Sequence, residues 1–245
     1  SMSYAVPLTL PAGYASATPS LALSYDSGGG NGVVGMGWSI DAPSIERTTL
    51  RGYPRYVAAD EFAADRSEQL VRVSTSGAGA VYRSRHEGGF VRRTWVDAGA
   101  AGYWKAETPD GSVHYFGARS DGTIVPEARL AGPSGETFRY HLVESVDLHG
   151  HRIRYDYALV DGMPYLAKIA YAFDAGGSVA RYTVSLAYAA RPDPISDAKP
   201  GFETRMTQRL VSVTIATAGE TVRKYVLRYE TLLVSGGLSR LVGVD

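Results

Sequence analysis

The chain contains no cysteine among its 245 residues, which excludes disulfide scaffolds, thiolate zinc sites, iron–sulfur clusters and cysteine nucleophiles. It also has no excess of charge, because 25 Lys and Arg balance 25 Asp and Glu. A nucleic-acid-binding surface needs a basic stripe, so we predict no nucleic-acid partner. No apolar run reaches the ~18 residues that a membrane span requires. The first residues, SMSYAVPLTLPAG, lack the charged and apolar regions of a signal peptide.

Helical patterns are scarce. Only residues 58–70 have a helix-compatible composition, and their poor apolar spacing favours a loop or one short helix. Period-2 alternation recurs instead, with large residues two apart in the segments 21–25, 113–115, 151–159, 182–188, 211–215 and 225–229. Together with 28 glycines, about 11% of the chain against a usual ~7%, this pattern is typical of antiparallel strands with one wet face. We predict an all-β fold of mostly antiparallel hairpins, forming a curved sheet or distorted sandwich with little or no helix.

Turn signals separate the alternating runs, as at Asp161-Gly162 and Gly176-Gly177. Residues 189–205 carry three prolines and few large apolar groups, which predicts a long exposed loop between two hairpins. No domain-scale linker interrupts the pattern, so we predict one β-rich domain over residues 1–245. Within it we expect hairpins at 105–160 and at 165–245. Since Ser239–Asp245 resembles the beginning of a strand, we expect the chain to be a fragment of a longer protein.

One glycine-rich segment has the spacing of a nucleotide loop. Gly30 to Gly35 matches G-x-G-x-x-G, but a dinucleotide fold requires this motif to open a helix. The following residues, MGWSIDAP, contain helix breakers. We therefore interpret the segment as a glycine-rich loop that passes close beneath Trp38, and we predict no cofactor.

Three groups of residues are candidates for chemical sites. Asp147, His149 and His151 have metal-ligand spacing, but a hairpin turn is the better interpretation, so we predict no metal. Ser74–Ser76 resembles one element of an ADP-ribosyltransferase, yet the chain contains no Glu-x-Glu. Trp95, Tyr103 and Trp104 suit a sugar-stacking platform, although a buried core is favoured. No G-x-S-x-G elbow is present, and we predict no catalytic residue.

The first ~60 residues carry an ordered set of short motifs. These are LPAG at 10–13, PSLALSY at 19–25, GNG at 30–32, GMGW at 35–38, IER at 45–47, GYP at 52–54 and DEF at 60–62. This signature region, residues 10–62, resembles the SpvB-type N-terminal domain, which occurs in the Salmonella virulence plasmid B protein and in the B component of insecticidal Tc toxin complexes. Residues 109–117 and 147–157 also resemble the related Rhs/YD strand-turn-strand style.

The resemblance implies a non-catalytic structural or scaffold domain of a larger secreted bacterial toxin. Such a domain forms a shell segment that encloses or delivers a toxic C-terminal domain. It implies that Gly32, Gly35, Gly37, Trp38 and Arg47 are architectural. The glycines would allow tight passage of the chain, Trp38 would fill the core, and Arg47 would pair with a carboxylate or cap carbonyls.

The expected partners are the rest of the parent chain or other toxin-complex subunits, together with self-association through exposed strand edges. Two alternatives remain open. One is a surface β-module that binds glycan or a partner protein, and the other is an NAD-dependent ADP-ribosyltransferase. The extracellular location rests on the resemblance alone.

Overall fold

The computed structural model describes residues 2–14, 17–40, 42–76, 79–98, 101–232 and 237–245. Over these residues the regular elements are strands, together with the 3-10 turn η2 (Pro126–Ala128). The first half contains β1 (Ser3–Pro7), β2 (Ala22–Asp26), β3 (Asn31–Gly32), β4 (Gly35–Met36), β5 (Trp38–Ser39), β6 (Ser44–Arg47), β7 (Phe62–Ala64), β8 (Glu68–Ser76), β9 (Gly79–Ser84), β10 (Arg92–Val96), β11 (Tyr103–Glu107) and β12 (Val113–Phe116). The second half contains β13 (Arg129–Ala131), β14 (Thr137–Val146), β15 (Arg152–Val160), β16 (Met163–Phe173), β17 (Ala180–Asp197), β18 (Thr204–Thr217), β19 (Glu220–Leu232) and β20 (Leu238–Val244). The predicted all-β, antiparallel fold is confirmed.

Fifteen strands form one sheet, and half of it closes on itself. Strands β6 to β12 follow one another in order, and β14 pairs with both β6 and β12. These pairings close an eight-stranded antiparallel barrel. The closure was not predicted, because alternation identifies a strand without identifying its partner.

Aromatic side chains fill the barrel. Trp104 on β11 is fully buried and makes edge contacts with Phe62 on β7 and Tyr82 on β9, each at a centroid distance of 4.9 Å. Trp95 on β10 completes the group, with its ring 5.4 Å from Trp104 and 5.5 Å from Tyr140 on β14. Since these rings come from five strands around the barrel, its interior is a packed core and not a ligand cavity.

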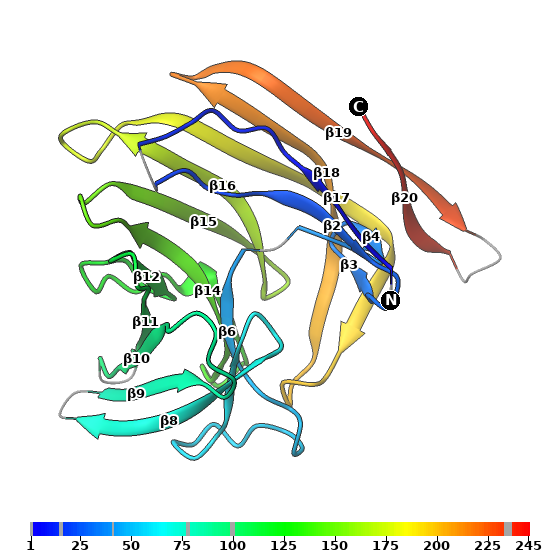
Figure 1. Ribbon diagram of the computed structural model, residues 1–245. Coiled ribbons are helices and arrows are strands. Elements are labelled where there is room, and N and C mark those ends of the chain that lie inside the picture. The colour runs from blue at the N-terminus through cyan, green and yellow to red at the C-terminus, as the bar shows by residue number, and fades with distance from the viewer. Residues whose placement is uncertain (1, 15–16, 41, 77–78, 99–100, 233–236) are drawn as a thin grey trace.

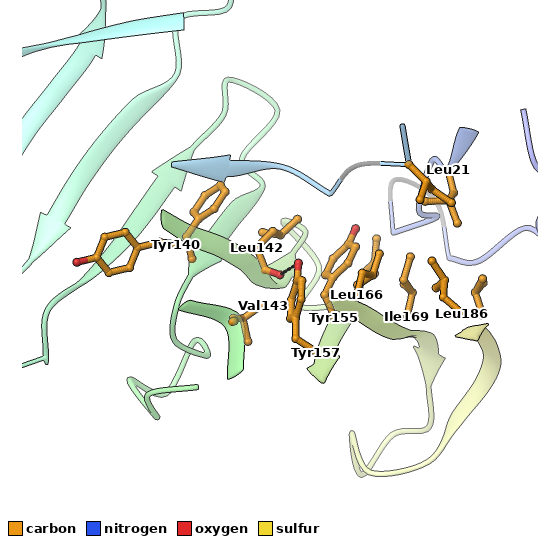
Figure 2. Packing of buried hydrophobic residues seen from close by; sticks show 14 of the residues in the cluster. Leu21, Tyr140, Leu142, Val143, Tyr155, Tyr157, Leu166, Ile169 and Leu186 are labelled. Atoms are coloured by element: carbon orange, nitrogen blue, oxygen red, sulfur yellow. Dashed lines mark hydrogen bonds between the residues drawn. The ribbon is translucent and has the colours of Figure 1, made fainter. Parts of the chain in front are cut away.

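The sheet continues from β14 through β15 to β20 as an open, curved layer. The small sheet β1-β2-β5 lies over this layer (Figure 1). Figure 2 shows Leu21 of the N-terminal segment facing Ile169 and Leu186 of the layer, and the hydroxyl of Tyr157 donating to the Leu142 carbonyl at 2.9 Å. This half of the molecule is therefore a distorted sandwich attached to a barrel.

Two segments differ from their predictions. Residues 58–70 contain β7 and the start of β8, joined by a tight turn in which Asp65 and Arg66 both have positive φ. Residues 189–205 are mostly strand, since β17 extends to Asp197 and β18 begins at Thr204. The ladder between them is interrupted from Ala190 to Ile195. This interruption accommodates Pro192 and Pro194, which cannot donate to a ladder.

No helix among the residues that the structure describes is long and apolar enough to cross a membrane.

Candidate functional site

The glycine-rich segment forms a hairpin and not a helix. Strands β3 and β4 pair across Val33 and Val34, so the phosphate-binding helix of a dinucleotide fold does not form. Gly35 has φ +91°, and a Cβ there would lie 2.7 Å from the Ser239 carbonyl. Gly37 has φ +75°, and its Cβ would lie 2.6 Å from the Tyr25 ring. Both positions exclude side chains, because the backbone is left-handed and the neighbours are too close.

The hairpin is held by a buried polar cluster that links distant parts of the chain. We call Asn31, Arg191, Asp193 and Ser239 the anchor cluster. Arg191 donates to Asn31 Oδ1 at 2.8 Å, to the Gly32 carbonyl at 3.1 Å and to both carboxylate oxygens of Asp193 at 3.1 Å. Asp193 also accepts from Asn31 at 2.8 Å and from the backbone N–H and hydroxyl of Ser239 at 2.7 and 2.6 Å.

The anchor cluster is an ion pair removed from water. The side chain of Arg191 is 0% exposed and that of Asp193 only 6%. Burial by itself would raise the pKa of Asp193, but hydrogen bonds from Arg191, Ser239 and Asn31 outweigh burial and hold this pKa well below its usual value. The cluster therefore joins the glycine-rich hairpin to β17 and β20 through charged groups that satisfy one another.

Sequence reasoning did not find the anchor cluster. Arg191 and Asp193 lie in residues 189–205, which the three prolines led us to predict as an exposed loop. The only available signal was the Arg-Pro-Asp-Pro segment at 191–194. Nothing in its spacing indicates that the pair meets Asn31, whose sequence separation from Asp193 is 162 residues.

Trp38 lies at the start of β5, beside the glycine-rich hairpin. Its ring is half-buried, packs against the main hydrophobic cluster and contacts Tyr25 at a centroid distance of 5.3 Å. An added Cβ at Gly32 would approach the Trp38 carbonyl to 3.0 Å.

We expect Trp38→Ala to lower the free energy of unfolding by about 2 kcal/mol, roughly half the usual cost of removing a fully buried aromatic side chain. Thermal unfolding followed by circular dichroism measures the effect, and an unchanged midpoint would show that Trp38 does not fill core. The matched control is Tyr53→Ala, since Tyr53 is exposed on a loop.

Arg47, at the end of β6, connects the barrel to the loop that follows it. Its guanidinium donates to Asp60 at 2.7 Å and to the Thr137 carbonyl at 3.1 Å. It also lies 5.0 Å from the ring centroids of Tyr56 and Phe62. Arg47 thus contacts a carboxylate, a carbonyl and two rings at once, a set of contacts that suits a positioning role.

Tyr56 extends this connection to the second half of the molecule. Its hydroxyl donates to the Pro200 carbonyl at 2.5 Å, and its ring stacks on Phe202 at 6.4 Å. Burial is the main reason that the pKa of Tyr56 is raised to about 12, although Arg47 opposes the rise. Tyr56 is therefore a neutral donor that ties the loop after β6 to the connection between β17 and β18.

A cavity of about 240 Å³ lies where the barrel meets the open layer. Its polar lining includes His114, Ser145, Asp147 and His151. His114 Nδ1 and Ser145 Oγ are 2.8 Å apart. Burial lowers the pKa of His114 despite an opposing contribution from Asp110, so its ring is neutral near pH 7.

Asp147 serves the adjacent turn. Its carboxylate accepts from the backbone N–H groups of His149 and His151 at 2.9 and 2.8 Å, and it contacts the His151 ring at 2.9 Å. The predicted turn at His149-Gly150 is confirmed, with β15 beginning at Arg152. Among the described residues, no three His, Cys, Asp or Glu side chains are grouped to hold a metal ion. The polar groups around this cavity stabilise a turn and a strand pair.

The three aromatic residues that suit a sugar-stacking platform do not form one exposed surface. Trp104 is wholly inside the barrel and is not available to a sugar. Trp95 and Tyr103 are half-buried, and Trp95 packs on Trp104. Ser74–Ser76, weighed as a transferase element, forms the end of β8.

A family model for the Salmonella virulence plasmid 65kDa B protein, SpvB, matches residues 1–189. Curated relatives named mono(ADP-ribosyl)transferase SpvB, from Salmonella choleraesuis strain SC-B67 and from Salmonella typhimurium, are 32% identical over 186 residues. That alignment covers 66% of this chain and 30% of theirs. The chain therefore matches less than a third of the length of these relatives.

Solved structures agree over nearly the whole fold. The N-terminal domain of the effector protein SpvB from Salmonella typhimurium strain LT2 superimposes with a TM-score of 0.82 at 25% identity, covering 98% of this chain and 97% of that one. The Photorhabdus luminescens Tc holotoxin pore gives a TM-score of 0.85 at 23% identity, covering 99% of this chain and 14% of that one. The second likeness shows the fold alone. From the family match and the agreement in structure, we conclude that this chain belongs to the SpvB family.

Proposed function

We propose that this chain is a non-catalytic scaffold domain of a larger secreted bacterial toxin, and that it forms a wall segment that encloses or delivers a toxic domain elsewhere in the parent chain. The observation that carries the proposal is the use made of the buried polar groups. In the anchor cluster they join the glycine-rich hairpin to β17 and β20. Arg47 joins β6 to Asp60 in the loop that follows and to the Thr137 carbonyl of β14, and Asp147 binds the backbone of its own turn. Charged groups that are paired within the domain in this way stabilise a wall and are not available to bind a substrate.

The extent of the family match supports the same proposal. The named activity of the curated relatives is ADP-ribosyl transfer, and this chain aligns with only 30% of their length. One solved relative is an isolated N-terminal domain, and another is part of a holotoxin pore. We propose that any transferase or other toxic activity resides in another part of the parent, and that the partners are that part or other toxin subunits.

Two measurements test this proposal. Calorimetry with NAD and an ADP-ribosylation assay on residues 1–245 are expected to show neither binding nor transfer. In the full parent protein, limited proteolysis is expected to leave the toxic domain protected, and deletion of residues 1–245 is expected to expose it. NAD turnover by residues 1–245 would contradict the non-catalytic part of the proposal. Equal protease sensitivity with and without this domain would contradict the scaffold part.

The open end of the sheet predicts self-association. Strand β20 ends the strand order and pairs with β19. Asp245 exchanges both backbone hydrogen bonds with Val226, so the neighbouring Val244 directs its N–H and C=O away from β19. Asp193 and Gly35 cover β20 at Ser239, so the exposed edge is the C-terminal part of the strand. An exposed edge of this kind is a template for another strand.

We expect concentration-dependent dimers of residues 1–245 in sedimentation velocity experiments. Val242→Lys, which places a charge on β20 at an exposed position, is expected to shift the equilibrium toward monomer by at least tenfold. Val222→Lys on the exposed part of β19 serves as the control. A wild-type protein that is strictly monomeric at millimolar concentration would refute the prediction.

A further inference from the structure

Charge is unevenly distributed along this neutral chain. Residues 66–93 contain six arginines, two glutamates and no lysine. The chain as a whole has equal numbers of acidic and basic residues, so this segment is basic and the remainder is acidic. The segment covers β8, β9 and the start of β10, on the side of the barrel far from β19 and β20 (Figure 1).

Several of these arginines lie on the outside of the barrel beside apolar residues. On β9, Tyr82 and Ser84 are buried, so the alternating residue Arg83 faces outward. Its partner across the ladder is Val71 on β8. Val73 follows at the bulge of β8, and Arg85 bonds to Gln69 beside them. We define the arginine face as Val71, Val73, Arg83, Arg85, Phe90 and Arg92.

The backbone of Phe90 is bound to this face by Arg83, and Phe90 adopts a strained conformation. Its side chain is 69% exposed, and its φ of +51° lies in the left-handed region, which is strained for a bulky residue. Arg83 donates to the Phe90 carbonyl at 3.1 Å and holds this conformation. Strained and exposed aromatic residues persist where the surrounding structure fixes them, and such positions are enriched at binding sites.

The acidic groups nearby leave a positive excess. Glu68 is paired with Arg93 at 2.6 Å and also accepts from Ser84, so its charge is balanced by Arg93 within the barrel wall. Glu107 is shared between Lys105 at 2.9 Å and Arg92 at 3.9 Å. Glu87 is the one acidic residue in the exposed loop 85–90. The guanidinium groups of Arg83 and Arg85 therefore have hydrogen-bond partners that carry no charge.

We propose that the arginine face docks an acidic protein segment that places an apolar side chain against Phe90, Val71 and Val73 and carboxylates against Arg83 and Arg85. Carboxylates suit guanidinium groups because two parallel hydrogen bonds form between the planar groups. The residue types favour a protein over a lipid or nucleic-acid surface, since arginine and aromatic residues are enriched in protein interfaces and lysine is depleted.

A labelled peptide of alternating Glu and Leu residues is the probe, and fluorescence anisotropy measures its binding to residues 1–245. We expect binding that weakens as salt rises, because exposed charges are screened. Phe90→Ser and the double variant Arg83→Gln/Arg85→Gln are each expected to weaken binding at least tenfold. Arg85→Glu is a second charge test that leaves the contact between Arg83 and Phe90 in place.

The controls replace an exposed apolar residue and an exposed arginine elsewhere, with Val222→Ser on β19 and Arg205→Gln on β18. These changes are expected to leave peptide affinity unchanged. Thermal unfolding of every variant confirms that it is folded. Three results would overturn the proposal. The first is a loss of peptide affinity in the control variants equal to that in the test variants, and the second is equal affinity for a peptide with Gln in place of Glu. The third is preferential binding to phosphatidylglycerol vesicles or single-stranded DNA that the test substitutions abolish.

Discussion

Replacing Asp193 by alanine is expected to lower the free energy of unfolding by about 3–5 kcal/mol, the usual cost of leaving one member of a buried ion pair without its partner. Arg191 has a side chain that is 0% exposed and would retain only uncharged partners, among them Asn31 and the Gly32 carbonyl. The backbone N–H and hydroxyl of Ser239 would also lose their acceptor. Denaturant unfolding followed by tryptophan fluorescence measures the change.

An exposed ion pair provides the control for Asp193. Glu230 contacts Arg240 at 3.2 Å on the surface strands β19 and β20. Because exposed pairs contribute about 1 kcal/mol or less, Glu230→Ala is expected to have a small effect. The double variant Arg191→Met/Asp193→Leu is expected to recover part of the loss, since it removes both buried charges. A loss for Asp193→Ala no larger than that for Glu230→Ala would refute the anchor role.

The contribution of Asp193 also depends on pH in a defined direction. Its folded pKa lies below its unfolded value, so the ionised group stabilises the folded state above the unfolded pKa of ~3.9. This stabilisation is lost as the pH falls from that value through the folded pKa. We therefore expect the difference in stability between the wild type and Asp193→Ala to be largest near neutral pH and to shrink below about pH 4. A constant difference down to pH 2 would contradict the pairing.

Trp104→Ala is expected to lower the free energy of unfolding by about 3–5 kcal/mol, the range for removing a buried aromatic side chain. Trp104 is fully buried, and its ring contacts Phe62, Tyr82 and Trp95 inside the barrel. The neighbouring rings come from three other strands and cannot all move into the space left behind. Near-ultraviolet circular dichroism and denaturant unfolding measure the loss of ring packing and of stability.

A Trp104→Phe variant separates the contribution of ring packing from that of the indole nitrogen. Nε1 is buried and has no hydrogen-bond partner among the residues that the structure describes, so Trp104→Phe removes an unsatisfied polar atom while it keeps an aromatic ring. The phenylalanine variant is expected to lose much less stability than the alanine variant. Equal losses in the two variants would show that ring packing is not the dominant contribution of Trp104.

The amino-acid pattern was sufficient for the strands with regular alternation. The segment 151–159 was predicted to alternate, and Ile153, Tyr155 and Tyr157 are indeed buried. Leu159 has the same parity but is exposed, and it lies next to the end of β15 at Val160. The turn at Asp161-Gly162 was also predicted correctly, and both residues have positive φ, as a two-residue hairpin requires.

The candidate site was only partly accessible from the sequence. Gly32, Gly35, Gly37, Trp38 and Arg47 were selected through resemblance, and their architectural roles remain a prediction for the experiments above. The residues that contact the glycine-rich hairpin from β17 and β20, namely Arg191, Asp193 and Ser239, were not predicted. To predict them, one must know that β17 and β20 pass beside the hairpin of β3 and β4. Short-range sequence patterns contain no information on such contacts.

The sequence by itself determined the secondary structure class, the positions of most hairpins and the absence of thiol chemistry, because these depend on residue type and on period-2 alternation. Only the tertiary structure decided that β14 closes a barrel with β6 and β12, that the proline-rich segment is strand, and that Arg191 and Asp193 are buried. The physical reason is that alternation specifies which face of a strand is apolar. It leaves the partner strand, and therefore the buried polar contacts between distant strands, to be selected by the packing of the whole chain.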